Sequence, residues 1–337
     1  MKAFFHPAQD KHIPKTYFTR GQMRQPQEVP DRTAQMLIGL REMGVSVLQP
    51  SDQGAAPIAK VHDLGYLRFL ESAHQRWMKM DDWGEEVISN IFVREPNHLT
   101  GILAEAARYQ ADGSSPIGEH TWEAAYWSAQ SALGAADALM AGERTSYAVC
   151  RPPGHHARRD AAGGFCYLNN VAIAAEHLKR KFPRIAILDP DMHHGQGIQE
   201  IFYDRSDILY VSIHGDPTNF YPVVTGHENE RGEGEGFGYN INLPMPHGSS
   251  EDVFFEKLDE ALKAIRLYQP DVLIIALGFD IYKDDPQAKV SVSSEGFCRM
   301  STHISQLGLP TLIVQEGGYD LDTLSENVQQ FFKGLAK

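Results

Sequence analysis

The sequence predicts an α/β fold in three layers, α/β/α, with a mostly parallel sheet between two layers of helices. Five short apolar runs, which begin near residues 147, 185, 208, 272 and 310, each stop abruptly at polar or charged residues. Such runs suit strands that are buried on both faces, as in a parallel sheet. Beyond Cys150 they alternate with stretches of helical character, which is the pattern of βαβ units.

The elements are expected in the following order along the chain. Residues 1–30 are polar and carry four prolines, which indicates an extended lead-in with loops. A helix should begin at Asp31, as its N-cap, and stop at Gly44. The stretch 121–141 contains many small residues, which permit close packing on a sheet. Helices are further expected at residues 65–80, 121–141, 171–182, 249–268, 293–307 and 322–335.

Residues 84–119 show a looser pattern, with several glycines and prolines. A long irregular segment inside a compact domain is usually either functional or disordered. The aromatic and apolar residues of this stretch argue against disorder. No internal repeat and no linker is recognisable, so residues 1–337 are expected to form a single domain.

Composition excludes several classes of protein. The net charge of -13 argues against nucleic acid as the main partner, because phosphate binding needs a basic patch, and it suits a cationic substrate better. Cys150, Cys166 and Cys298 are too few and too scattered for a disulfide framework. No window reaches the roughly 18 apolar residues of a membrane span, and the first residues lack the apolar core of a signal peptide. A cytoplasmic location is therefore expected.

Residues of the types that commonly bind metals follow two of the apolar runs. Asp191 and His193 follow one run and are two residues apart, so that both side chains could hold one ion. Asp280 ends another run and supplies a third ligand. Three protein ligands with an open position form the layout of a catalytic Zn²⁺ site, although Fe²⁺ or Co²⁺ remain alternatives. The competing interpretation is that Asp191 and His193 merely cap helices.

Two further motifs follow strands. In Arg151-Pro-Pro-Gly-His155-His156, two prolines and a glycine stiffen a turn that presents adjacent imidazoles, and one of these could take and return a proton. In Glu316-Gly-Gly-Tyr319, the tyrosine hydroxyl could donate to a developing oxyanion. Taken alone, each motif also fits a structural turn.

Together these motifs resemble the histone deacetylase superfamily, and within it the bacterial acetylpolyamine amidohydrolases. The resemblance spans about residues 30–335. The segments that carry it, in family order, are Arg151–His156, Gly163–Asn170, Asp189–Gly195, Val211–Pro217, Leu277–Asp280 and Glu316–Tyr319. The resemblance implies the arginase/deacetylase fold and a zinc-dependent hydrolase that acts on linear amides.

By resemblance, each motif residue has an expected role. Asp191, His193 and Asp280 would bind Zn²⁺. His156 would be the general base and then the general acid, His155 an electrostatic helper, and Tyr319 the oxyanion donor. The remaining expected residues are Asp189, which orients His155 and holds K⁺ with Ser212; Gln196, which orients His156 where much of the family has Asp or Asn; and Gly164, Phe165 and Tyr221, which line a narrow substrate channel.

Residues 81–119 match in length and place a family insertion that constricts the channel mouth and helps to form a homodimer. Two positions where the resemblance implies acidic residues carry Leu103 and Ser114 instead, with Glu105, Asp112 and Glu119 nearby. Which of these acids faces the channel is left open.

The preferred function is deacetylation of a small cationic N-acetylated amine. The alternatives are a protein or peptide acetyl-lysine deacetylase, and a non-catalytic binder of acetylated ligands. A two-metal, arginase-like hydrolase is disfavoured because His194 and Gly195 supply no further carboxylate.

Overall fold

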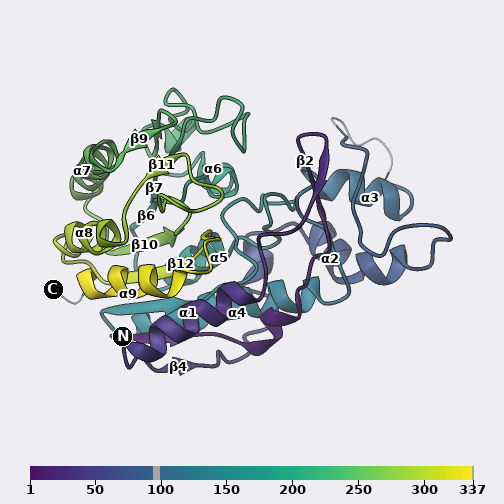
Figure 1. Cartoon of the computed structure of the whole chain (residues 1–337), viewed down its shortest axis with the longest axis horizontal. Coiled ribbons are helices and arrows are strands. Elements are labelled where there is room, and N and C mark those ends of the chain that lie inside the picture. Colours follow the sequence, from purple (N-terminus) through teal and green to yellow (C-terminus); the bar gives the residue numbers. More distant parts are fainter. Residues whose placement is uncertain (94–98, 336–337) are drawn as a thin grey trace.

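A parallel sheet forms the centre of the computed structural model, which describes residues 1–93 and 99–335. Each neighbouring pair of strands in the sheet runs parallel. This confirms the predicted sheet (Figure 1). In the described part of the chain, its spatial order is β4 (Val47–Leu48), β1 (Lys2–Phe4), β5 (Thr145–Ala148), β12 (Thr311–Gln315), β10 (Val272–Leu277), β6 (Ile185–Asp189), β7 (Ile208–Gly215) and β8 (Asn240–Met245).

Both faces of the sheet are apolar because successive strand residues enter opposite cores. In β10, Ile274 and Ala276 pack into one cluster, whereas Leu273 and Ile275 pack into the other. The first cluster is closed by α2 (Leu64–Trp77), α3 (Ile102–Tyr109), α4 (Thr121–Met140), α5 (Asn170–Leu178) and α6 (Gln196–Phe202). The second is closed by α1 (Asp31–Glu42), α7 (Glu251–Tyr268), α8 (Ser294–Ser305) and α9 (Leu324–Leu335). The three-layer α/β/α prediction is therefore confirmed.

The first 30 residues contain more structure than the sequence indicated. Strand β1 pairs with β5 inside the sheet, and a hairpin of β2 (Tyr17–Thr19) and β3 (Gln22–Arg24) follows. These three-residue strands are too short to show a periodic pattern, and only their partners define them. The N-cap prediction was also wrong: Pro30 occupies the cap position and Asp31 begins α1, whereas Gly44, at φ +69, does end the turn.

The described part of the segment 84–119 contains more regular structure than the sequence indicated. It contains α3, and it is tied by single bridges between Val87 and Ile117 and between Gln110 and Ala162. Residues 94–98 of this predicted insertion, like 336–337, lie outside the described residues. The hairpin and α3 lie at the end of the molecule opposite α7 and α8 (Figure 1). The short helix α6 was not expected either, since seven residues carry little periodic signal.

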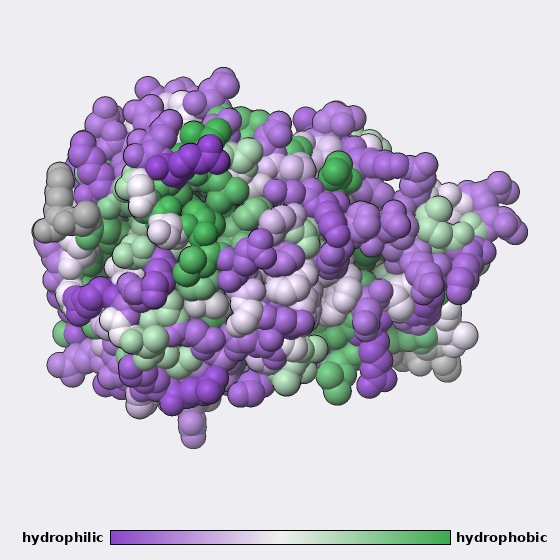
Figure 2. Space-filling model, turned by 90° about the horizontal axis from the view of Figure 1, so that it is seen from below, coloured by the Kyte–Doolittle hydropathy of each residue, from purple (hydrophilic) through white to green (hydrophobic). Residues whose placement is uncertain are grey.

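The surface is mostly hydrophilic on the face that Figure 2 shows, with hydrophobic side chains gathered toward one end. The edge strand β4 exposes Val47 and Leu48 by 38% and 40%. Its length of two residues leaves little backbone for pairing with another chain. Among the described residues, no helix combines the length and apolar character that crossing a membrane requires.

Close packing between α1 and α9 gives a first prediction. A Cβ atom at Gly39 would lie 2.7 Å from the backbone carbonyl oxygen of Ser325. Gly39→Ala should gain ~1 kcal/mol of helix propensity, but overpacking costs ~1–3 kcal/mol. We expect the free energy of unfolding to fall by about 1 kcal/mol in denaturant titrations. A more stable variant would mean that α9 moves aside freely.

Candidate active site

The motifs singled out in the sequence meet at the carboxyl end of the sheet. The turns after β5, β6, β10 and β12 carry the His pair, Asp191 with His193, Asp280 and Tyr319 respectively. The carboxyl ends of parallel strands share one edge, which is where α/β proteins place their ligand sites. The six side chains are buried or nearly so.

Asp191, His193 and Asp280 form a cluster with the ligand atoms of a metal site. One atom of each residue lies within 4.8 Å of the others. The His193 Nδ1 atom is 3.1 Å from Asp280 Oδ2 and 3.4 Å from Asp191 Oδ1, so both carboxylates point at one ring nitrogen. Two buried carboxylates and an imidazole directed at a common point fit a divalent cation.

The carboxylates are held by backbone N–H groups and approached by glycines. Met192 N–H donates to Asp280 Oδ1 at 3.0 Å, and Gly317 N–H donates to Asp191 Oδ2 at 2.9 Å. A Cβ atom at Gly317 would lie 2.5 Å from Asp280 Oδ2, so a larger residue would push into the cluster. Burial, followed by the nearby charge of Asp191, raises the pKa of Asp280 to about 7. The cluster therefore concentrates negative charge that a cation would neutralise.

The two imidazoles of the His pair have different partners. His155 Nδ1 lies 3.1 Å from Asp189 Oδ2, an oxygen that also accepts from the Tyr210 hydroxyl at 2.8 Å. His156 Nδ1 lies 2.6 Å from Gln196 Oε1. Asp189 thus lies against His155 and Gln196 against His156, and their roles in orienting the two rings stay a prediction.

The two environments shift the pKa values of the two rings in opposite directions, although the ring centroids are only 3.9 Å apart. Burial, followed by the charges of His155 and His193, lowers the pKa of His156 well below its usual value. Burial also acts to lower the pKa of His155, but the carboxylates of Asp191 and Asp189 outweigh it and raise this pKa to about 10. The carboxylates therefore favour the charged form of His155, whereas burial favours the neutral form of His156.

Tyr319 is positioned through its backbone and its ring. Its N–H donates to Asp285 Oδ2 at 2.6 Å, and the guanidinium of Arg32 lies 4.7 Å from its ring centroid. Burial raises the pKa of Tyr319 well above its usual value. The hydroxyl therefore stays protonated and able to donate a hydrogen bond.

A buried ion network connects the turns that carry these side chains. Glu28 Oε1 lies 3.0 Å from Arg32 Nη1 and 2.8 Å from Arg151 Nε, and all three residues are buried. Arg32 also donates to the carbonyl oxygens of Gly318 and Glu316, both at 2.6 Å. The Glu316 carboxylate in turn accepts from the His155 N–H at 3.0 Å. Helix α1, the His pair and the tyrosine turn thus form one connected unit.

A cavity of about 210 Å³ leads to His156, His193 and Tyr319. The three predicted channel residues line it: Gly164, Phe165 and Tyr221. Gly164 has φ +55, and a Cβ atom there would collide with the ring of His156. Phe165 keeps a positive φ of +68 with a bulky side chain, a strained conformation of the kind found at functional sites. Residues of the β2–β3 hairpin complete the wall, namely Tyr17, Thr19, Arg20 and Arg24.

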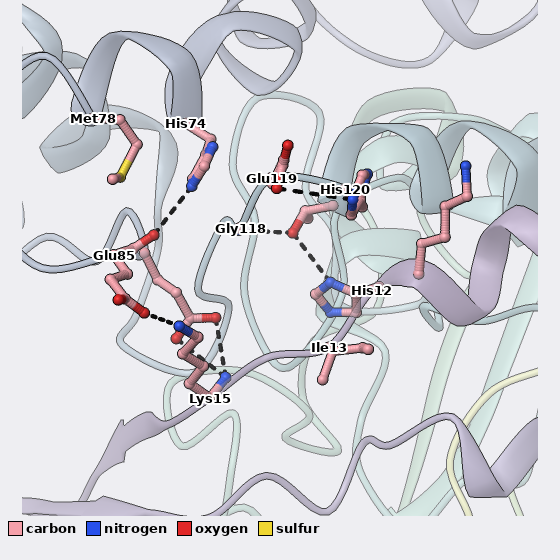
Figure 3. A pocket seen from close by; sticks show the side chains of 12 residues that line it. His12, Ile13, Lys15, His74, Met78, Glu85, Gly118, Glu119 and His120 are labelled. Carbon is pink, nitrogen blue, oxygen red and sulfur yellow. Dashed lines mark hydrogen bonds and ion pairs between the residues drawn. The ribbon is translucent and has the colours of Figure 1, made fainter.

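None of the three nearby acids lines this cavity. Glu105 forms an ion pair with Arg76, and Asp112 accepts a hydrogen bond from the hydroxyl of Tyr221. Glu119 lines a separate pocket of about 370 Å³ together with His74 and other residues (Figure 3).

The two positions where the resemblance implied acids lie in different surroundings. Ser114 lines the channel cavity, whereas Leu103 packs against the core. The assignment of residues 81–119 to the channel rim stays a prediction.

The residues expected to hold K⁺ are neighbours across two strands. The register of β6 and β7 pairs Asp189 with Ser212, and Ser212 Oγ lies 2.8 Å from His214 Nδ1. K⁺ binding stays a prediction.

Four residues that matter to the geometry were not found from the sequence. Glu28, Arg32 and Asp285 act on turns distant in the chain, so no local pattern could reveal them. Phe220 stacks on His193, with ring centroids 4.8 Å apart and planes at 17°. Its position beside Tyr221 was a signal that could have been used.

Comparisons with known proteins show which family the chain resembles. The family description "Histone deacetylase domain" matches residues 26–335. The chain is 62% identical to an acetylpolyamine amidohydrolase of Burkholderia pseudomallei, over 99% of this chain and 98% of that one. It is 37% identical to an acetylpolyamine amidohydrolase of Mycoplana ramosa, over the full length of both.

Solved structures give the same result. A crystal structure of acetylpolyamine aminohydrolase from Burkholderia pseudomallei has a TM-score of 0.99 at 62% identity, and the match covers 100% of this chain and 98% of that one. The crystal structure of the HDA15 HD domain has a TM-score of 0.81 at 26% identity, with 99% and 88% covered.

The buried ion network gives a second prediction. Glu28→Gln would leave the charges of Arg32 and Arg151 buried beside a neutral amide, and breaking a buried pair in this way costs about 3–5 kcal/mol. We expect a loss of that size in the free energy of unfolding, measured by denaturant titration. The matched control is Glu42→Gln at the exposed end of α1, which should change stability by less than about 0.5 kcal/mol. Equal effects of the two substitutions would contradict the role of the network.

Proposed function

The chain belongs to the histone deacetylase family, and we propose that it removes the acetyl group from small N-acetylated amines. As a member of this family it is a metal-dependent deacetylase. The observation that carries the proposal is the joint placement of the metal cluster, the His pair and Tyr319 at the bottom of one narrow cavity. Each feature alone fits a structural role, but their convergence on one point fits amide hydrolysis.

We assign Zn²⁺ to Asp191, His193 and Asp280, with Fe²⁺ or Co²⁺ as alternatives. When bound, the metal would polarise the acetyl carbonyl and lower the pKa of the attacking water. We further propose that K⁺ binds at Asp189 and Ser212, where it would stabilise the strand ends that carry the ligands.

The remaining steps fall to side chains of this chain. His156, neutral and held at Nδ1 by Gln196, would take a proton at Nε2 and deliver it to the leaving amine. His155, held at Nδ1 by Asp189, would act as an electrostatic helper beside His156. Tyr319, kept protonated by burial, would donate to the oxyanion.

The proposed substrate class rests on the dimensions of the channel and on the named relatives. A cavity of about 210 Å³, walled by Phe165 and Tyr221 and closed in by the hairpin, suits a slim alkylamide better than a folded protein. The relatives at 62% and 37% identity are named for acetylpolyamines. The net charge of -13 favours a cation overall, although Arg20 and Arg24 line the mouth itself. An acetyl-lysine peptide is therefore the alternative substrate.

We also infer that residues 1–337 form one deacetylase domain, that 81–119 shapes the rim, and that this segment contributes to a homodimer. The contact of Ser114 with the cavity supports the rim assignment. The cytoplasmic location stays a prediction.

Removing a catalytic group should abolish most activity without unfolding the protein. For His156→Ala we expect turnover to fall by roughly 10²–10⁴-fold, since a general acid–base is lost. For Tyr319→Phe we expect roughly 10²–10³-fold, since an oxyanion donor is lost. The measurement is acetate release by protein whose metal content matches wild type. Tyr268→Phe on α7 is the control and should act like wild type; near-normal rates in the two site variants would contradict the assignment.

Metal removal and a substrate panel test the rest of the proposal. Acetate release should stop after chelation and return with added Zn²⁺, because the metal is proposed to polarise the acetyl carbonyl and to activate the attacking water. The panel comprises N-acetylputrescine, N-acetylcadaverine, acetylspermidine and an acetyl-lysine peptide, with the diamines expected to react fastest. Comparable rates on the peptide would favour the alternative substrate. Binding without acetate release from any compound would favour a non-catalytic binder.

A further inference from the structure

A chain of three hydrogen bonds runs from His156 to a carboxylate in the rim segment. His156 Nδ1 lies 2.6 Å from Gln196 Oε1, and Gln196 Nε2 lies 3.0 Å from the hydroxyl oxygen of Tyr221. That hydroxyl lies 2.7 Å from Asp112 Oδ2. An amide therefore stands against the histidine, and the carboxylate lies two side chains further out.

The surroundings of Asp112 define the direction of every bond in this chain. The N–H groups of Ser114 and Gly164 donate to its oxygens at 2.8 Å and 3.2 Å, and the Ser114 hydroxyl donates as well. These three donors, directed at one carboxyl group, fit a carboxylate that only accepts hydrogen bonds. The Tyr221 hydroxyl must then donate its proton to Asp112.

The direction of the Tyr221 hydrogen bond determines the orientation of the Gln196 amide. Because the Tyr221 proton points at Asp112, the hydroxyl oxygen can only accept from Gln196, which must therefore present its NH₂ group there. The Gln196 carbonyl then faces His156, whose Nδ1 must carry the hydrogen. Nε2 is left with its lone pair, the state that a general base needs.

A rotated amide would give the opposite result. With no carboxylate at 112, the Tyr221 hydroxyl could donate to Gln196 Oε1 instead, and the amide could turn by 180° at little steric cost. Its NH₂ group would then face Nδ1 and force the hydrogen onto Nε2, where the ring could take no proton. A neutral amide by itself can adopt either of these two orientations. An amide that is hydrogen-bonded through Tyr221 to a carboxylate can adopt only one of them.

We propose that Asp112 is a positioning residue which, through Tyr221 and Gln196, fixes the tautomer of His156. The approach of Asp112 depends on a turn without side chains, since a Cβ atom at Gly163 would lie 2.9 Å from Asp112 Oδ2. The aligned bonds also polarise one another, which makes the Gln196 carbonyl a stronger acceptor. The catalytic consequence rests on the proposed function, whereas the tautomer does not.

The direct test is nuclear magnetic resonance of the zinc-loaded protein with ¹⁵N-labelled histidine, with signals assigned by His156→Ala. Wild type should show His156 with hydrogen on Nδ1. Asp112→Asn and Tyr221→Phe should each convert part or all of this signal to the Nε2–H form. Glu119→Gln, an acid-to-amide change on the same segment at an exposed position, is the control and should leave the signal unchanged. An unaltered tautomer in folded Asp112→Asn and Tyr221→Phe would overturn the proposal, whether or not the protein is a deacetylase.

Kinetics separate positioning from direct substrate contact. With an N-acetylated monoamine, which has no second ammonium, Asp112→Asn should lower kcat by roughly 10–100-fold with little change in KM. Adding Asp112→Asn to Tyr221→Phe should cause no further loss, because the two residues act in series. A rise in KM confined to acetylated diamines, with normal kcat on the monoamine, would instead make Asp112 a binder of ammonium and overturn the proposal. Inactivity of wild type on every amide would remove the proposed function and leave the tautomer measurement to decide.

Discussion

One buried carboxylate between two buried arginines holds the active site together. Glu28 neutralises part of the charge of Arg32 and Arg151, and the pKa of Glu28 is lowered because these two positive charges outweigh its burial. The remaining donors of the arginines are used by backbone carbonyls: Arg32 binds those of Glu316 and Gly318, and Arg151 binds that of Gln9 at 2.9 Å. Turns have no ladder of hydrogen bonds to hold them. In this protein, charge-assisted hydrogen bonds from the two arginines to the carbonyl oxygens of the turns hold the turns in place.

The metal cluster and the His pair could be found from the sequence because a parallel sheet makes local patterns meet. Asp191, His193, Asp280 and Tyr319 each follow an apolar run, and the ends of such runs share an edge whatever the strand order. Arg32 gave no such signal, because its partners lie 284 and 286 residues away. Strand β1 gave none either, since three residues define no period.

The acids near the channel show a different limit of sequence reasoning. The sequence shows that Glu105, Asp112 and Glu119 lie near the expected positions, but it does not show whether another residue of the protein already binds each acid. In the folded chain Glu105 is paired with Arg76, and Asp112 is held by Tyr221. The partner that satisfies an acid decides its role, and that partner is a tertiary property. The cavity mouth is lined by Arg20 and Arg24 of the hairpin, and by none of these three acids.

The place of β12 in the sheet has a consequence for the synthesis of the protein. This strand, residues 311–315, lies between β5 and β10, although both precede it in the chain. Until it leaves the ribosome, the two halves of the sheet have no common partner, and Arg32 has no Gly318 to bind. Contacts of such long sequence separation form late and leave strand edges exposed meanwhile. The facing edges of β5 and β10 therefore stay unpaired in nascent chains until residues 311–315 have been made.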